Sequence, residues 1–161
     1  REACETAAKY FASILRKKVT HLRDVTMAEW VLYRGGLSET TAKRAVHPIG
    51  EDERVLQGAA LLEKGDLAGF GALMYDSHES SRNWFENSCE ELDTIVDAAK
   101  AIPAVYGARL SGGGFGGSCC LLVDPTAADE IAEAIKNEYK AKHGDLPTVS
   151  LIRPSDGAHL V

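Results

Sequence analysis

Hydrophobic positions in the first hundred residues recur at three- and four-residue steps, a pattern typical of amphipathic helices. The pattern predicts helices over 1–16, 27–34, 38–62, 67–83 and 89–101. Helix starts are indicated by Ser38 and Asp66 as caps, and by two Ser/Thr-x-x-Glu capping boxes, Thr26 to Glu29 and Ser88 to Glu91. The buried stripe of the helix over 67–83 is expected to hold the residues Leu67, Phe70, Leu73, Met74 and Trp84.

Pro48 and Gly50 interrupt the longest of these patterns. Proline inside a helix lacks a donor and clashes with the preceding turn, at a cost of ~3 kcal/mol. We therefore expect a kink or a break there, with the helix resuming over 54–64. The apolar residues of that second part are Val55, Leu56, Ala59 and Leu62.

Strand-like runs appear only in the last third of the chain. Strands are predicted over 104–110, 119–123 and 148–153, with a short fourth over 158–161, and a helix over 126–142 separates the second from the third. A run of helices followed by two strands, a helix and two more strands predicts an α+β fold, with an antiparallel sheet of about four strands covered by helices. The absence of a repeat or a low-complexity linker favours one domain over 1–161.

Composition narrows the function classes. The net charge of −6 over 161 residues argues against a nucleic-acid or anionic-membrane partner. No apolar run approaches the ~20 residues of a membrane span, and no signal peptide is recognised. Four cysteines without metal or disulfide spacing predict reduced thiols in a cytoplasmic protein. Because the first residue is Arg1, the natural start is expected to lie upstream.

The chain is organised around a glycine loop, residues 112–117, where five of six residues are glycine and the sixth is Phe115. Successive N–H groups in such a loop form a nest that holds an anion. A strand follows the loop, which excludes the dinucleotide fingerprint, and no lysine ends it, which excludes a Walker loop. A flexible hairpin turn stays the alternative. Arg109 would lend charge to a phosphate or face solvent or an acidic partner, and Ser111 would bind phosphate or close its own turn.

Four other residues have both a functional and a structural interpretation. His78 lies beside acidic and hydroxyl residues, but sequence neighbours on a helix do not face each other, which favours a structural histidine over a general base. His47 is expected at a helix end or in a loop. Glu51 and Arg54 are three apart and suit a helical ion pair of ~0.2–0.5 kcal/mol.

The stretch from Tyr106 to Cys119 resembles the third conserved motif of the GHMP small-molecule kinases. Its Gly-Gly-Gly-Phe-Gly-Gly form is similar to the galactokinase branch of that family. The likeness continues through 1–8, 22–25, the His47, Glu51, Arg54 spacing, 65–80, 88–93 and 154–158.

The resemblance implies transfer of the γ-phosphoryl group of ATP to galactose with Mg²⁺, and identifies this chain with the C-terminal half of such a kinase. The cleft would be lined by the residues Ser111, Gly112, Gly113, Gly114, Phe115, Gly116 and Gly117, with Arg109 as a candidate charge contact. The family's catalytic aspartate, its Gly-Leu-Ser-Ser-Ser loop and most of its sugar pocket have no counterpart here. We therefore expect no catalytic residue and no metal ligand in this chain, and ATP and Mg²⁺ held mainly by an N-terminal kinase half.

Two other functions stay open. The first is a non-catalytic sugar and nucleotide sensor of galactokinase type. The second is a free-standing interaction domain, which a large exposed apolar face would argue against. Phe115 is expected to pack into a neighbouring domain or core.

Overall fold

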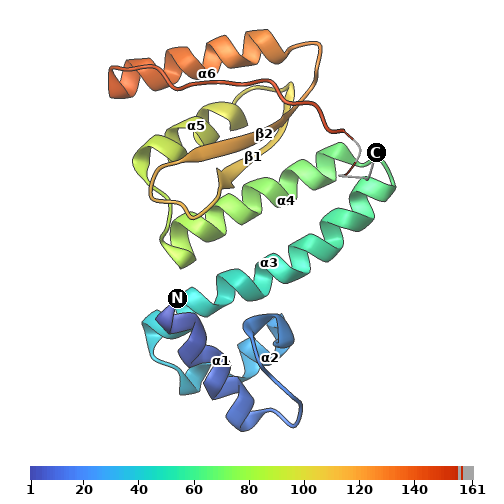
Figure 1. The fold of residues 1–161 in the computed structure, drawn as a ribbon, viewed down its shortest axis with the longest axis vertical. Helices are drawn as coiled ribbons and strands as arrows, with labels where there is room; N and C mark the ends of the chain where they lie inside the picture. The colour runs from blue at the N-terminus through green and yellow to red at the C-terminus, as the bar shows by residue number, and fades with distance from the viewer. Residues whose placement is uncertain (156, 158–161) are drawn as a thin grey trace.

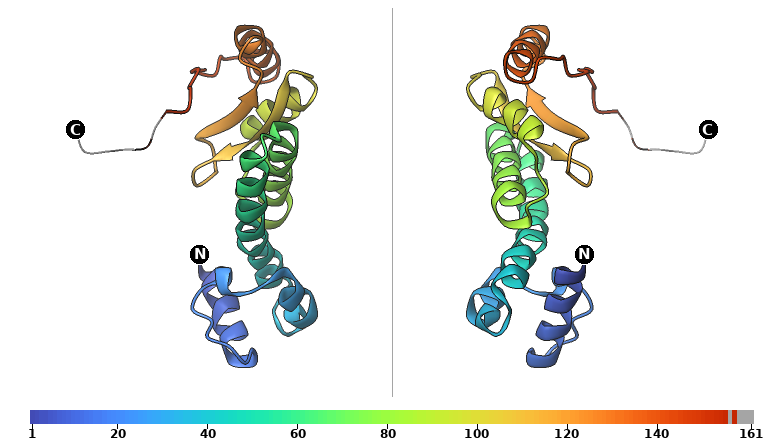
Figure 2. Two further views of the ribbon diagram at one scale, coloured as in Figure 1. Left: turned by 90° about the vertical axis from the view of Figure 1, so that its right-hand side faces the viewer. Right: turned by 90° about the vertical axis from the view of Figure 1, so that its left-hand side faces the viewer.

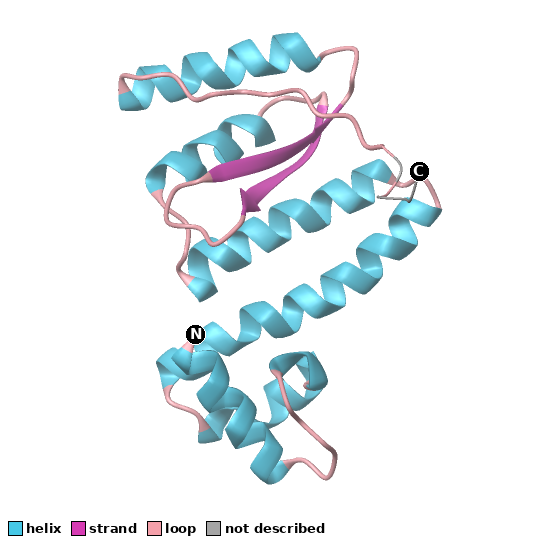
Figure 3. Cartoon of the chain, in the orientation of Figure 1, coloured by secondary structure: helices cyan, strands magenta, loops and turns pink. Residues whose placement is uncertain are grey.

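The computed structural model describes residues 1–155 and 157 (Figure 1). It contains helices, short 3₁₀ turns, one π-helical turn and a hairpin of strands (Figure 3). In chain order the elements are α1 (Glu2–Ile14), η1 (Leu22–Asp24), α2 (Met27–Tyr33), η2 (Arg34–Gly36), α3 (Glu39–Glu63), α4 (Leu67–Ser80), the π-helical η3 (Ser81–Phe85), α5 (Glu90–Lys100), β1 (Val105–Ser111), β2 (Ser118–Val123) and α6 (Ala128–His143).

The antiparallel pair α3 and α4 connects two groups of elements (Figures 1 and 2). At one end, α1, η1 and α2 pack against the first half of α3 around Phe11, Trp30 and Ile49. At the other end, α4 and α5 pack against β1, and α6 packs against α5. The second core includes Val96 and Ile131. The first core thus includes residues of α3, and the second packs against Tyr75 of α4.

Local signals placed most helix starts correctly. Thr26 and Glu29 form the expected capping box, with the Thr26 N–H donating to Glu29 Oε2 over 2.8 Å. Ser38 and Asp66 cap α3 and α4 through the N–H groups of Thr41 and Gly69. The box expected at Ser88 is wrong: α5 begins after Cys89, and the Ser88 hydroxyl donates to Asp93 instead.

The break expected at Pro48 and Gly50 is also wrong, because α3 runs as one helix of 25 residues with Pro48 inside it. Pro48 removes the N–H that would bind the carbonyl four residues earlier. Its neighbours Ala45 and Ile49 are both completely buried in the first core. Burial of this face offsets the lost hydrogen bond, so tertiary packing overrides the local preference.

The α+β class is confirmed, but the described sheet has two strands rather than about four. β1 and β2 pair antiparallel from Val105 with Val123 to Ser111 with Ser118. The strand expected over 148–153 is wrong, because that segment has no strand structure and leaves Ile152 82% exposed. An alternating pattern of apolar and polar residues does not form a strand where neither face of the segment is buried. The fourth expected strand, 158–161, lies outside the described residues.

Several apolar helix side chains are exposed, and one of them, Trp84, was expected in a buried stripe. Val55 and Leu56 on α3 are 68% and 70% exposed, and Trp84 is 50% exposed. On α4 the buried positions are Gly71, Ser77, His78 and Ser80 rather than the predicted stripe. Small and polar residues face inward here because α4 packs on β1 and because Ser77, His78 and Ser80 contact polar side chains of α3 and α5.

Candidate functional site

The glycine loop joins β1 to β2 and has an unusual backbone. Four of its glycines, Gly112, Gly114, Gly116 and Gly117, have φ between 82° and 107°. Phe115 also lies in the left-handed region, at φ 57°. Only glycine adopts such conformations without steric strain, so this path requires the glycine-rich sequence. The loop is thus a hairpin connection between β1 and β2, with left-handed backbone at five of its six residues.

Most backbone donors of this loop are unpaired. Among the described residues, the N–H groups of the five glycines have no hydrogen-bond partner, whereas the Phe115 N–H donates to the Asn87 carbonyl over 2.7 Å. Consecutive free N–H groups in a turn with positive φ values form a concavity that binds anions. The loop can therefore hold a phosphate without a lysine.

Asn87 fixes the loop and was missed by sequence reasoning. Its side-chain Nδ2 donates to the Gly113 carbonyl over 3.2 Å, and its own carbonyl accepts from Phe115. A Cβ at Gly114 would overlap the Asn87 carbonyl, so the two segments touch backbone to backbone. Because the contacts span about 26 residues and use mostly backbone atoms, no motif could have indicated them.

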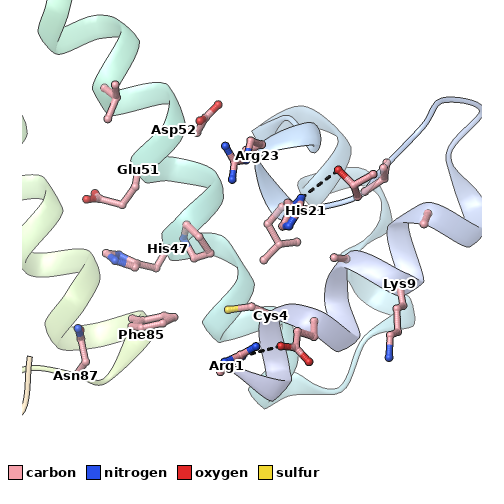
Figure 4. Close-up of a pocket in the computed structure, with 18 of the residues that line it drawn as sticks. Arg1, Cys4, Lys9, His21, Arg23, His47, Glu51, Asp52, Phe85 and Asn87 are labelled. Atoms are coloured by element: carbon pink, nitrogen blue, oxygen red, sulfur yellow. Dashed lines mark hydrogen bonds and ion pairs between the residues drawn. The ribbon is translucent and has the colours of Figure 1, made fainter. Parts of the chain in front are cut away.

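An open groove of about 970 Å³ lies beside the loop, and Gly112 and Gly113 border it. Figure 4 shows His47 and Glu51 of α3 with Phe85 and Asn87 on one side, and residues of α1 and the η1 region opposite. The groove therefore has walls from segments that are far apart in sequence and meet at the glycine loop.

Glu51 gathers three donors at the edge of this groove. It accepts from Arg54 Nε over 2.6 Å and from Ser77 Oγ over 2.9 Å, and lies 3.2 Å from a guanidinium nitrogen of Arg109. Burial favours the neutral acid, but the hydrogen bonds from Arg54 and Ser77 outweigh it and lower the pKa of Glu51. Arg109 thus has an acidic partner, one of the two arrangements its position in the strand allowed. Ser111 ends β1 opposite Ser118, directly before the loop.

Both conspicuous histidines are structural in setting. His78 is completely buried, and its Nδ1 accepts from the Leu110 N–H over 3.2 Å. His47 lies within α3 and not at a helix end or in a loop as expected, because α3 continues past Pro48. It bonds Ser80 Oγ over 3.0 Å and stacks on Phe85. Burial lowers the pKa of both rings, which keeps them neutral.

No group of three acidic, histidine or cysteine side chains among the described residues is placed to bind a metal ion. No helix in residues 1–155 is long and apolar enough to cross a membrane.

Comparison with known proteins identifies the family. Residues 59–141, which include the glycine loop, match the family model of the GHMP kinases C terminal. Galactokinases of Bos taurus and Homo sapiens are each 38% identical over all 161 residues, and the chain spans only 38% of their length. The crystal structure of Lactococcus lactis galactokinase complexed with galactose superposes with a TM-score of 0.85 at 28% identity, over 90% of this chain and 37% of that one. The chain therefore belongs to the GHMP kinases, as a C-terminal domain of galactokinase type.

Proposed function

We propose that this chain is the C-terminal half of a galactokinase. The whole protein would transfer the γ-phosphoryl group of ATP to the anomeric hydroxyl of galactose. The observation that carries the proposal is the glycine loop, a turn beside a groove in which five glycine N–H groups have no partner among residues 1–155 and 157. Phosphoryl transfer needs chiefly positioning and stabilisation of charge, and backbone donors supply both.

In this proposal each part of the site has a separate task. The glycine N–H groups bind the oxygens of the transferring phosphoryl group, and Ser111 adds a hydroxyl at the end of the loop. The positive charge of Arg109 is partly neutralised by Glu51, so Arg109 contributes at longer range. The bond from the γ-phosphorus to ADP breaks, and a bond to the sugar oxygen forms. The sugar proton passes to the aspartate of the N-terminal half.

Mg²⁺ would supply further charge stabilisation when bound. Among the described residues, no group of three or more acidic, histidine or cysteine side chains could hold a metal ion. On the resemblance to galactokinases, we assign Mg²⁺, the nucleoside part of ATP and most of the galactose pocket to the N-terminal half.

Exposed apolar side chains support the need for that second half. Phe115 is 78% exposed at the tip of the glycine loop, and Val55 and Leu56 are exposed on α3. Packing the N-terminal half on these side chains would bury them, as was expected of Phe115. This surface argues against a free-standing interaction domain. With its four cysteines free, the protein is proposed to work in the reducing cytoplasm.

The test is an assay of ADP release by the full-length protein that contains this chain. Galactose, N-acetylgalactosamine and arabinose are compared, each with Mg²⁺ and with EDTA. We expect sugar-dependent ADP release that EDTA abolishes, and none from the 161-residue chain alone. Binding of galactose and ATP without ADP release would identify a sensor instead. Enzyme-like turnover by the chain alone would contradict the division of labour proposed here.

A further inference from the structure

We propose that Asn87 is a positioning residue of this kinase, which sets the path of the glycine loop without touching the substrate. The inference rests on the proposed function. Two hydrogen bonds and one backbone contact join Asn87 to three consecutive loop residues, Gly113, Gly114 and Phe115. No other described residue outside the hairpin donates or accepts a recorded hydrogen bond with residues 112–117.

A strained turn delivers Asn87 to the loop. The π-helical η3 ends at Phe85, and the next residue, Glu86, lies in the left-handed region at φ 60°. A non-glycine residue keeps this conformation only where its surroundings enforce it. Glu86 is bound by Lys43 Nζ over 2.6 Å and by an Arg44 nitrogen over 2.8 Å, both on α3. These ion pairs therefore fix the turn before Asn87 on α3, the helix that also carries Glu51 and forms one wall of the groove.

The chemistry of Asn87 indicates a role in position rather than in stability. Asn87 is 6% exposed, and its buried Oδ1 has no hydrogen-bond partner in the part of the chain that the structure describes. The donation to Gly113 fixes which end of the amide is nitrogen, so the oxygen cannot gain a partner by flipping. A buried unpaired oxygen destabilises the fold, and an apolar side chain of the same shape would avoid that penalty. What an apolar side chain could not do is hold the Gly113 carbonyl.

Holding that carbonyl controls the donors on either side of it. The Gly113 carbonyl and the Gly114 N–H belong to one planar peptide, and the Gly113 N–H belongs to the peptide before it. Rotation of these peptides about the Gly113 Cα would turn both N–H groups away from a bound phosphate. An error of about 1 Å in such an arrangement can lower turnover by as much as 100-fold. Asn87 would act on kcat, because the loop contacts the transferring group rather than the sugar.

The experiment uses the full-length protein with Asn87→Leu, Asn87→Asp and the control Asn83→Leu. Leucine keeps the shape of asparagine without a donor, and aspartate sets a carboxylate against the Gly113 carbonyl. Asn83 lies in η3, four residues before Asn87, is exposed, and donates from its side chain to Glu79. Turnover, KM for galactose, thermal unfolding and amide hydrogen exchange of Phe115 are measured for each variant.

We expect kcat to fall about tenfold in N87L and further in N87D, with KM for galactose within about twofold of the parent. Exchange of the Phe115 amide should be faster in both variants. The N87L protein should unfold at the parent's temperature or above it, and N83L should match the parent throughout. Unchanged Phe115 exchange in N87L would overturn the inference. So would a loss of kcat that only follows a loss of folded protein. A parent without any sugar kinase activity would instead refute the proposed function, while the exchange measurement would still test the Asn87 contact.

Discussion

The buried imidazole of His78 on α4 accepts a hydrogen bond from the backbone N–H of Leu110 on β1, over 3.2 Å. The accepting nitrogen, Nδ1, must lack a proton, so the proton of the neutral ring is on Nε2. Nε2 lies 3.2 Å from Asp93 Oδ1 on α5. His78 thus connects α4 with β1, the strand that leads into the glycine loop, and lies beside Asp93 of α5. The hydrogen bond from Leu110 exists only while Nδ1 carries no proton.

Stability should accordingly fall in mild acid. Burial, followed by the charge of Arg82, lowers the pKa of His78 in the folded state below its usual ~6.5. The unfolded chain then takes up a proton first, so the free energy of unfolding decreases as pH falls below about 6.5 toward the folded-state pKa. Burial lowers the pKa of His47 in the same direction. Urea unfolding at pH 7.5 and 5.5 measures the effect.

The variant His78→Asn separates the two histidines in that experiment. It cannot titrate, so the difference in unfolding free energy between pH 7.5 and 5.5 should become smaller than in the parent. We attribute part of the pH dependence that remains in H78N to protonation of His47. An undiminished difference in H78N would show that His78 does not couple stability to pH.

Local chemistry explains which parts of this fold the sequence could predict. The capping box of Thr26 and Glu29 involves four consecutive residues, so its prediction needed no tertiary knowledge. Pro48 misled because the local cost of proline was visible while the burial of Ala45 and Ile49 was not. The pattern at Ser88 also fits a capping box, but the N-cap of α5 is Cys89 and the Ser88 hydroxyl donates to Asp93.

The parts of the candidate site also differ in whether the sequence could predict them. The glycine loop was recognisable because positive φ values select glycine, and that selection is written in the sequence. Asn87 was not, since its contacts join backbone atoms across a long sequence separation. The acidic partner of Arg109 was one of the open alternatives, and the structure shows that partner to be Glu51 of α3.

Gly71 should not tolerate alanine, although alanine normally stabilises a helix. A Cβ at Gly71 would overlap the Tyr106 carbonyl of β1, and one at Gly107 would overlap Gly71 in turn. Since both obstacles are backbone, the elements must separate, and we expect Gly71→Ala to lower the free energy of unfolding by about 3 kcal/mol. The control is Gly35→Ala, where a Cβ meets no atom within 4 Å. It should change stability by less than ~0.5 kcal/mol. Equal denaturation midpoints for the two variants would rule out this close approach.

Neutralising Glu51 should cost more than an exposed helical ion pair. Glu51→Gln keeps the shape but weakens the bonds to Arg54, Ser77 and Arg109 together. We expect a loss of about 1–3 kcal/mol, because two partly buried guanidinium groups lose a charged partner. Glu63→Gln, an exposed carboxylate at the end of the same helix, should stay within ~0.5 kcal/mol of the parent. Chemical denaturation of the parent, E51Q and E63Q measures the free energy of unfolding of each. A loss in E51Q no larger than in E63Q would show that the Glu51 cluster contributes no more than an exposed ion pair.

Two neighbouring glycines of the loop should respond differently to the same substitution. Gly114→Ala places a Cβ against the Asn87 carbonyl and forces alanine to φ 82°, so the loop must leave Asn87. Gly113→Ala meets no atom within 4 Å and has no such φ. The probe is hydrogen exchange of the Phe115 amide, whose bond to Asn87 reports the loop position. We expect exchange about tenfold faster in G114A, which corresponds to a loss of about 1.4 kcal/mol in the closed loop, and little change in G113A. If both variants exchange alike, steric contact with Asn87 does not determine the loop, and its glycines serve only flexibility.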